Sequence, residues 1–305
     1  MHIIRRRGWE VAERAVTPEH LVLHRRSLLA GATAMTILPA MGASADTPAV
    51  RDYKPGRPLT EEKYATTYNN YYEFGDSKDI WRDAQALKQR PWTIKLDGMM
   101  KQPRTIDIDD LLKQVSLEQR VYRHRCVEAW AMTVPWTGFP LAALLKLAEP
   151  LGSAKYVVFE TAQDKVMSGL DTPLYPWPYV EGVTIDEAGN DLAFISTGMY
   201  GKPLPPQNGG PIRLTLPWKY GFKSGKAIVK ISFTDKRPMT FWEALGPSEY
   251  GFWANVNPAV PHPRWSQATE RLLGSDERVP TQIFNGYAEQ VAALYADRKT
   301  EKLFM

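Results

Sequence analysis

Alternation of apolar and polar residues predicts several short strands along the chain. Residues 92–96 alternate, and the following Asp97-Gly98 pair is typical of a hairpin turn. Residues 156–161, 212–216 and 227–234 combine alternation with a high content of β-branched side chains. We therefore expect a strand at each of these four places.

Helical periodicity is weaker and confined to short stretches. Asp109 is a suitable N-cap for a short helix through Val115. A second helix is expected from Pro140 to Ala148, with proline in its first turn and Pro150 beyond its end. In residues 285–303, one face of a terminal helix would carry apolar side chains. These are Tyr287, Val291, Leu294 and Tyr295.

The frequent proline and glycine residues favour a fold with few helices. The sequence contains 24 Pro and 21 Gly, spread every few residues, which is typical of short strands joined by long loops. Residues 46–75 lack helical periodicity and are expected to cross the body as an extended segment. We predict an α+β, mainly β mixed-sheet fold, with residues 46–305 forming a single domain.

The first 45 residues have the pattern of an export signal. Arg25-Arg26-Ser27-Leu28-Leu29 opens an uncharged stretch that runs to Met41 and ends in Ala43-Ser44-Ala45, a small-residue cleavage site. The paired arginines resemble the twin-arginine signal, which exports proteins already folded around a cofactor. The alternative is a retained amphipathic helix. We predict a twin-arginine signal peptide over residues 1–45 and a periplasmic mature protein.

Charge and cysteine content exclude several functional classes. Lys and Arg total 38 against 34 Asp and Glu, a net charge of +4 that lies mostly in the first 45 residues, so a nucleic-acid partner is not expected. The single cysteine, Cys126, rules out an internal disulfide, a four-thiolate cluster and c-type haem attachment within this sequence.

Cys126 has unusually polar neighbours. Arg123, His124 and Arg125 precede it, and cationic neighbours lower the pKa of a thiol, whose thiolate form binds soft metals. The alternative is an inert buried cysteine. Glu128, two residues further on, is a candidate proton donor, although it could instead pair with Arg123 or Arg125.

Two stretches around this cysteine resemble a known family. Residues 125–130 (Arg-Cys-Val-Glu-Ala-Trp) and 134–141 (Val-Pro-Trp-Thr-Gly-Phe-Pro-Leu) resemble the molybdenum-cysteine segment of the sulfite-oxidase superfamily. Residues 68–74, 211–226 and 262–271 resemble one branch of it, the catalytic subunits of periplasmic protein-methionine-sulfoxide reductases. The resemblance spans roughly residues 50–300 and the leader.

The resemblance implies a cofactor and its contacts. Cys126 would be the protein ligand of molybdenum in one molybdopterin per chain, of the form that lacks a nucleotide. The positions that match pterin contacts are Asn69, Tyr72, Glu73, Thr161, Asn208, Arg213, Ser224, Gly225 and Lys226. Independently, Arg213 and the 223–226 turn offer positive charge and backbone N–H groups to a phosphate.

The reaction implied is oxygen-atom transfer from methionine sulfoxide in oxidised periplasmic proteins, with Cys126 and Glu128 as the catalytic residues. Electrons would come from another protein, which the resemblance identifies as MsrQ, a haem-containing membrane subunit. A sulfite dehydrogenase with the same fold is one alternative. A non-catalytic exported binding module with a sequestered thiol is another.

Overall fold

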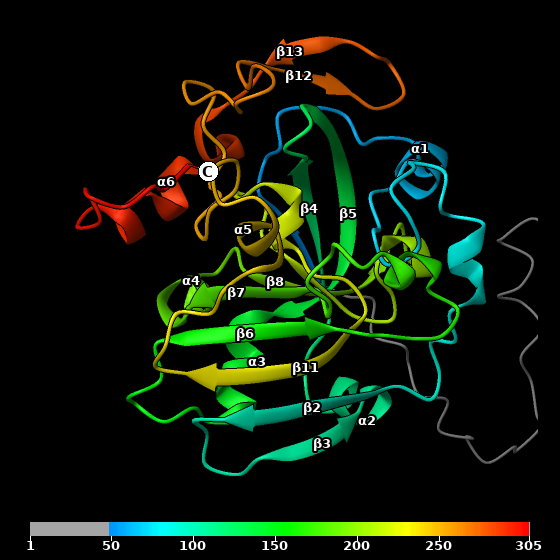
Figure 1. Cartoon of the computed structure of the whole chain (residues 1–305), viewed down its shortest axis with the longest axis vertical. Helices are drawn as coiled ribbons and strands as arrows, with labels where there is room; N and C mark the ends of the chain where they lie inside the picture. Colours follow the sequence, from blue (N-terminus) through cyan, green and yellow to red (C-terminus); the bar gives the residue numbers. More distant parts are fainter. Residues whose placement is uncertain (1–48, 305) are drawn as a thin grey trace, which may run out of the picture. The chain divides into compact units, whose positions relative to one another are not determined.

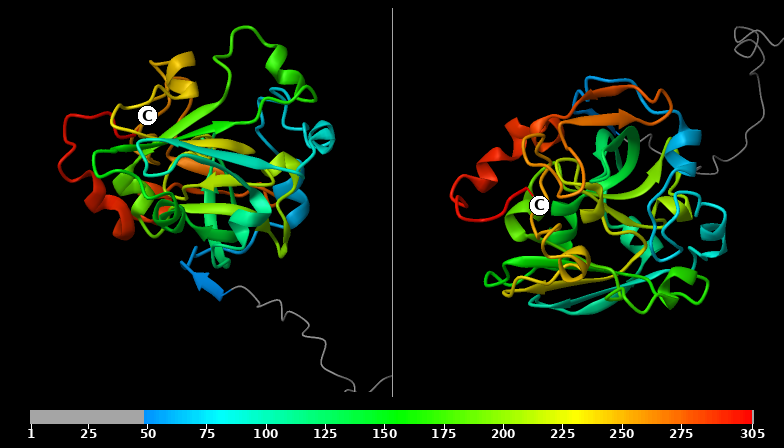
Figure 2. Two further views of the ribbon diagram at one scale, coloured as in Figure 1. Left: turned by 90° about the horizontal axis from the view of Figure 1, so that it is seen from below. Right: turned by 45° about the horizontal axis from the view of Figure 1, so that its top comes forward.

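Two β-sheets organise the chain, which a computed structural model describes over residues 49–304 (Figure 1). The predicted leader, residues 1–45, and the predicted domain start at residue 46 lie outside the described residues. Figure 1 and the right-hand view of Figure 2 show the smaller sheet at one end and the β12–β13 hairpin (Thr269–Leu272 and Arg278–Pro280) at the other. The mainly β, α+β fold predicted from the sequence is confirmed.

The larger sheet is built around β5 (Trp130–Pro140). This strand pairs antiparallel with β4 (Glu118–Arg125) and β8 (Phe194–Met199), and parallel with β12. The other described strands of this sheet are β1 (Ala49–Asp52), β9 (Lys202–Pro203), β10 (Arg213–Thr215) and β13. Side chains on both faces of β5 are buried, Trp136 and Phe139 completely, so β5 is the centre of the core.

The smaller sheet contains three of the strands predicted from alternation. Its order is β3 (Arg104–Asp107), β2 (Thr93–Gly98), β11 (Ile228–Thr234), β6 (Tyr156–Thr161) and β7 (Val180–Thr184). The fourth predicted strand is β10 of the larger sheet. The prediction of a hairpin turn at Asp97-Gly98 was wrong. Gly98 ends β2 with a φ of +83°, and the connection to β3 runs through residues 99–103.

The helices are short, and two predicted boundaries are shifted. The first predicted helix is α2 (Ile108–Leu112), capped by Asp107, whose carboxylate accepts a hydrogen bond from the Asp109 amide. The second is α3 (Leu141–Ala148), preceded by Pro140. The remaining short helices are α1 (Glu62–Thr67), α4 (Ile185–Gly189), α5 (Phe241–Leu245), η4 (Asp83–Ala86), η5 (Ser168–Asp171), η6 (Pro206–Asn208) and η7 (Gly221–Lys223). Residues 46–75 were therefore wrongly expected to be wholly extended, because α1 lies within them.

The C-terminal segment is not one helix. It consists of η8 (Ile283–Gly286), α6 (Ala288–Val291) and η9 (Ala292–Tyr295), and left-handed backbone at Phe284 and Asn285 interrupts the start. The predicted face is nevertheless real, since Val291 and Tyr295 are buried in the core. Packing of that face, rather than helical propensity, holds the segment in place.

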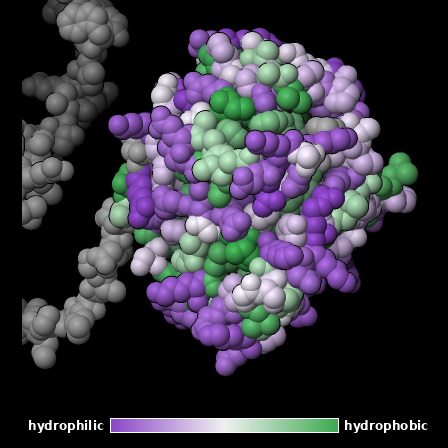
Figure 3. Space-filling view, turned by 90° about the vertical axis from the view of Figure 1, so that its left-hand side faces the viewer, coloured by the Kyte–Doolittle hydropathy of each residue, from purple (hydrophilic) through white to green (hydrophobic). Residues whose placement is uncertain are grey.

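The surface seen in Figure 3 is mainly hydrophilic, with small scattered apolar patches. This distribution is expected for a chain that places its large apolar side chains in the core. Within residues 49–304, no helix combines the length and the apolar character needed to cross a membrane.

Candidate active site

The single cysteine lies in a four-residue loop between the two central strands. β4 ends at Arg125 and β5 begins at Trp130, and the Cys126 amide donates to the Trp130 carbonyl (2.9 Å). The Ala129 amide donates back to the Cys126 carbonyl (3.1 Å), with Ala129 at a φ of +62°. The tight loop places the cysteine directly at the end of the most buried part of the sheet.

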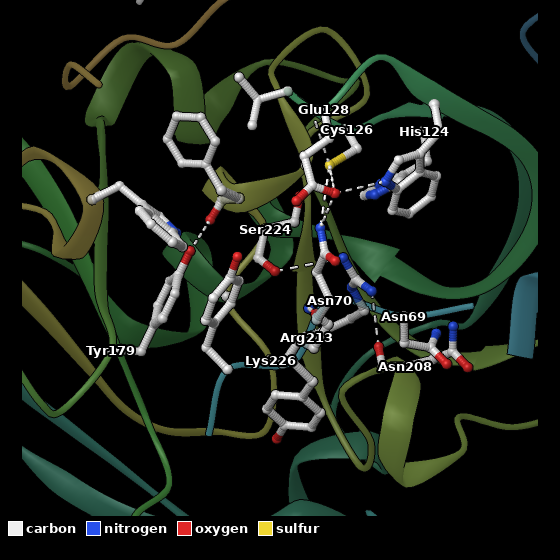
Figure 4. A pocket seen from close by; sticks show the side chains of 18 of the residues that line it. Asn69, Asn70, His124, Cys126, Glu128, Tyr179, Asn208, Arg213, Ser224 and Lys226 are labelled. Carbon is white, nitrogen blue, oxygen red and sulfur yellow. Dashed lines mark hydrogen bonds between the residues drawn. The ribbon is translucent and has the colours of Figure 1, made fainter. Parts of the chain in front are cut away.

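Cys126 faces a pocket with about 820 Å³ of space, part of which is open to solvent (Figure 4). Its walls come from segments far apart in the sequence. The lining residues are Tyr68–Glu73, His124, Cys126–Glu128, Trp130, Met132, Tyr179, Asn208, Arg213, Gly221, Phe222, Ser224–Lys226, Trp242 and Tyr250. The pocket is thus assembled only when the N-terminal segment, the β4–β5 loop and the 208–226 segment have folded together.

Contacts to the sulfur come from the N-terminal segment and from the loop itself. The Asn70 side-chain nitrogen is 3.3 Å from the Cys126 sulfur, and the Glu128 amide nitrogen is 3.5 Å from it. The Glu128 carboxylate accepts from Asn70 (3.1 Å) and from the Trp130 indole (3.1 Å), and pairs with Lys78 (2.8 Å). Sulfur, amide and carboxylate therefore form one connected group.

The expectation that arginines surround the sulfur was wrong. Side chains alternate along a strand, so His124 and Cys126 share the pocket face while Arg123 and Arg125 point to the other. Arg125 pairs with Glu270, and Arg123 donates to the Pro55 carbonyl. Glu128 accordingly pairs with Lys78 rather than with either arginine.

The pKa of the thiol is also opposite to the sequence-based expectation. Burial, together with the nearby Glu128 charge, raises the pKa of Cys126 to about 12. A thiol in this position ionises when a strong positive charge lies beside it, and a metal ion supplies such a charge. The site therefore suits a metal-bound thiolate better than a free nucleophile.

Two cationic side chains, Arg213 and Lys226, line the pocket together with the carboxylates of Glu73 and Glu128. Burial lowers the pKa of Arg213 to about 10, and burial together with the Arg213 charge lowers that of Lys226 to about 7. Burial and the charges of Arg213 and Lys226 likewise lower the pKa of His124. Arg213 donates to the Asn208 carbonyl (2.8 Å) and Lys226 to the Asn70 carbonyl (2.6 Å), and neither forms an ion pair within 4 Å among the described residues. The pocket therefore favours an anionic group such as phosphate.

Three buried amide oxygens in the pocket lack hydrogen-bond partners. They are the Oδ1 atoms of Asn69, Asn70 and Asn208. The Asn69 and Asn208 side-chain nitrogens both donate to the Ala65 carbonyl, at 3.3 and 2.9 Å. Buried acceptors are normally satisfied, so these oxygens fit N–H donors of a bound heterocycle. Together with the cationic groups, they fit a pterin that carries a phosphate.

The structure places the predicted residues around one pocket, except that Thr161 lies behind the residues that line it. Thr161 does not line the pocket: its hydroxyl donates to the buried Glu73 carboxylate (2.9 Å) and supports it from behind. The Ser224 hydroxyl accepts from the Leu216 amide (3.3 Å). The remaining predicted positions, Cys126, Glu128, Asn69, Tyr72, Glu73, Asn208, Arg213, Gly225 and Lys226, all line the pocket.

Sequence reasoning did not select several residues of the site. Asn70 and Lys78 contact the sulfur–carboxylate group, and Trp242 and Tyr250 form part of the wall. Asn70 stands beside Asn69 in the quoted motif, which was the available signal for it. Lys78, Trp242 and Tyr250 lie in no sequence motif that pointed to the site.

Comparison with known proteins agrees with this geometry. Residues 82–242 match the family model of the oxidoreductase molybdopterin binding domain. The chain is 45% identical, over 98% of its length, to the protein-methionine-sulfoxide reductase catalytic subunit MsrP of Ralstonia nicotianae, and the match covers 97% of that protein. The chain belongs to the MsrP family.

A solved structure also matches part of this MsrP-family chain. It is the sulfane dehydrogenase SoxCD from Paracoccus pantotrophus, with a TM-score of 0.42 and 17% sequence identity. The match covers 49% of this chain and 40% of that one.

Proposed function

We propose that this chain is a molybdenum-dependent reductase that removes oxygen from methionine sulfoxide residues of periplasmic proteins. The observation that carries the proposal is the position of Cys126. The side chain of the one cysteine in the sequence faces a pocket that also contains unpaired amide oxygens and the buried cations Arg213 and Lys226. The MsrP relationship supplies the reaction.

Cys126 is the proposed protein ligand of the metal, in one nucleotide-free molybdopterin per chain. Arg213 and Lys226 would hold the pterin phosphate, and the oxygens of Asn69, Asn70 and Asn208 would accept from ring N–H groups. Tyr72, Glu73, Gly225 and the backbone around Ser224 would complete the enclosure, with Thr161 fixing Glu73. When bound, the cofactor supplies two-electron oxygen-atom-transfer chemistry.

Glu128 is the proposed route for protons, two of which the reduction of a sulfoxide consumes. Burial by itself raises its pKa, but hydrogen bonds from Lys78 and Asn70 and the Lys78 charge outweigh burial and leave the pKa below its usual value. The carboxylate is therefore charged at neutral pH and accepts from Lys78, whose side chain is 27% exposed. A proton can pass from solvent through Lys78 to Glu128 at the edge of the pocket.

The outer wall of the pocket suits a thioether side chain. Tyr72 contacts Trp242 edge-on, with ring centroids 4.9 Å apart, and Trp242 contacts Tyr250 at 5.0 Å. Aromatic rings bind sulfur and methyl groups favourably. Sulfite is a small anion and would form few favourable contacts with this aromatic wall. The wall therefore favours methionine sulfoxide as the substrate rather than sulfite, the substrate of the alternative dehydrogenase.

Electrons must reach the site from another protein, and we propose a haem-containing membrane subunit of the MsrQ type as the donor. The sequence holds one cysteine and no c-type haem attachment motif, so it provides no four-cysteine cluster of its own. The proposed twin-arginine leader would bring the folded, cofactor-loaded protein to the periplasmic side, where such a donor and oxidised proteins would meet.

A paired assay tests this function. Purified enzyme is supplied with a chemically reduced viologen and an oxidised protein, and loss of sulfoxide oxygen is followed by mass spectrometry. Sulfite oxidation with an artificial acceptor is measured in parallel. We expect sulfoxide reduction that depends on molybdenum. Sulfite oxidation alone would support the dehydrogenase, and a folded, metal-free, inactive protein would support a binding module.

A further inference from the structure

A buried charge cluster lies on the side of the Cys126 loop that faces away from the pocket. Arg125 Nε is 2.8 Å from Glu270 Oε2, and Arg57 Nη1 is 2.6 Å from Glu270 Oε1. Arg125 and Glu270 are fully buried, and the Arg57 side chain is only 11% exposed. One carboxylate of β12 thus joins the N-terminal segment to the residue that precedes the cysteine.

The cluster continues into the backbone of the loop. Arg125 Nη1 donates to the Cys126 carbonyl, and Nη2 donates to the side-chain oxygen of Gln267 (2.7 Å). Gln267 Nε2 donates in turn to the Val127 carbonyl (2.8 Å), which also accepts from the Trp265 indole (2.7 Å). Arg125 therefore holds the carbonyl of Cys126 itself. Trp265 and Gln267 hold the carbonyl of the next residue, Val127.

These contacts determine the direction of the sulfur. The loop is too short to form its own regular structure, and the planes of the peptide groups on either side of Cys126 set the direction of its Cα–Cβ bond. Asn70 and the Glu128 amide contact the sulfur from the pocket side, while Arg125 and Gln267 hold the backbone from the opposite side.

A contribution to the free energy of unfolding does not by itself explain why these charged groups are buried together. The cost of desolvating a buried carboxylate and two guanidinium groups offsets much of their attraction, and apolar replacements of such clusters are often as stable. The cluster instead fixes the orientation of two peptide carbonyls, because Arg125 donates to that of Cys126 and Gln267 to that of Val127. None of Arg125, Gln267 and Glu270 lines the pocket.

We propose that Glu270 and Gln267 are positioning residues that, through Arg125 and the Val127 carbonyl, aim the Cys126 sulfur into the pocket. The proposal rests on the proposed function, which makes this sulfur the metal ligand. Partners that orient a metal ligand typically change metal affinity or activity about ten- to hundredfold when they are removed.

The test uses three variants of the full chain. Glu270→Gln removes the charge between the two arginines. Gln267→Ala removes the hydrogen bonds that Gln267 forms with the Val127 carbonyl and with Arg125 Nη2, but leaves both ion pairs of Glu270 intact, so it serves if Glu270→Gln does not fold. The matched control is Asp276→Asn in the turn of the same β12–β13 hairpin, which removes an ion pair with Arg271 (2.6 Å). The Asp276 carboxylate takes no part in the hydrogen bonds that hold the Cys126 and Val127 carbonyls.

Three readouts are made on each folded holoprotein: molybdenum per chain, the electron paramagnetic resonance spectrum of the metal, and the rate of Cys126 alkylation by iodoacetamide. Because the sequence has one cysteine, every chain in which peptide mass spectrometry finds a carbamidomethylated cysteine is modified at Cys126. We expect alkylation about tenfold faster or more in Gln267→Ala and Glu270→Gln, with an altered spectrum, and wild-type behaviour in Asp276→Asn.

Wild-type alkylation rates and spectra in both folded cluster variants would overturn the positioning role. Equal acceleration in Asp276→Asn would overturn it too, because the effect would then be general loosening of the hairpin. A wild-type protein without molybdenum would contradict the proposed function instead, and the ratio of alkylation rates would still decide whether the cluster directs the sulfur.

Discussion

The side-chain nitrogen of Asn70 lies 3.3 Å from the sulfur of Cys126, across 56 positions of sequence. The same nitrogen is 3.1 Å from the Glu128 carboxylate, so one amide connects the sulfur to the acidic residue at the edge of the pocket. Lys226 donates to the backbone carbonyl of Asn70 (2.6 Å) and holds this residue against the cationic part of the site. Asn70 thus joins the two ends of the pocket.

Asn70→Ala tests this connection. A hydrogen bond to a charged group contributes about 1.5–3 kcal/mol, so we expect kcat/KM for sulfoxide reduction to fall about ten- to hundredfold. Activity is normalised to molybdenum content in steady-state assays. Thr66→Ala, which removes a hydroxyl bonded to the Glu62 carbonyl (2.8 Å), is the control. An unchanged kcat/KM in Asn70→Ala would show that the amide contact has no role in the reaction.

Lys226 makes cofactor retention depend on pH. Its pKa of about 7 in the pocket rises when an anion binds, because the anion favours the charged ammonium. Binding is therefore strongest below pH 7 and weakens above it, by up to about tenfold per pH unit until the pKa of the complex is reached. Molybdenum retained after incubation across pH 6–10 measures this effect.

Lys226→Arg is the matched variant, since arginine remains charged over that pH range. We expect the variant to lose the pH dependence while it still retains the cofactor at pH 6. Parallel retention curves for wild type and Lys226→Arg would exclude Lys226 as the group that titrates.

Lys219 illustrates a motif residue with a structural role. Its ammonium is fully buried, 2.5 Å from Glu187, and donates to the Trp253 carbonyl (2.8 Å) and to Asn255 (2.9 Å). Lys219→Met leaves Glu187 buried without its partner, so we expect a loss of about 3–5 kcal/mol in the free energy of unfolding. Urea unfolding measures it.

The double variant Lys219→Met with Glu187→Gln checks the cause of that loss. Because it removes both charges, it should be less destabilised than the two single changes added together. Strict additivity would mean that the ion pair itself does not couple these residues.

Export provides a test of the leader. Replacement of Arg25 and Arg26 by Lys should leave the protein in the cytoplasm, because the twin-arginine pair is the proposed recognition element. Cell fractionation and immunoblotting measure the distribution, with Arg14→Lys as a control upstream of the signal. Normal export of the double variant would refute the leader assignment.

Sequence patterns predicted the smaller sheet better than the larger one. β6 has one half-buried and one buried face, so its alternation was visible and residues 156–161 match its bounds. β5 was not predicted, because both its faces are buried and it contains Pro135, which normally argues against a central strand. The terminal helix was predicted as continuous, but left-handed backbone at Phe284 and Asn285 is a tertiary feature that periodicity does not reveal.

At the site, the residues that carry charge or a motif were predictable, and their partners were not. Cys126 stood out as the single cysteine, and Arg213 and Lys226 as cations close to glycine-containing turns. Lys78 became a partner of Glu128 only through the fold, which turns Arg123 and Arg125 to the other face of β4. The raised pKa of Cys126 likewise follows from burial, which flanking residues do not report.

The most direct test of the whole account is molybdenum per chain in the purified mature protein, wild type against Cys126→Ser. We expect about one molybdenum per wild-type chain, since one thiolate ligand serves one cofactor. In Cys126→Ser, a folded protein should lose the metal or retain it without sulfoxide reduction. Equal metal content and equal sulfoxide reduction in the two proteins would contradict the central role of this sulfur.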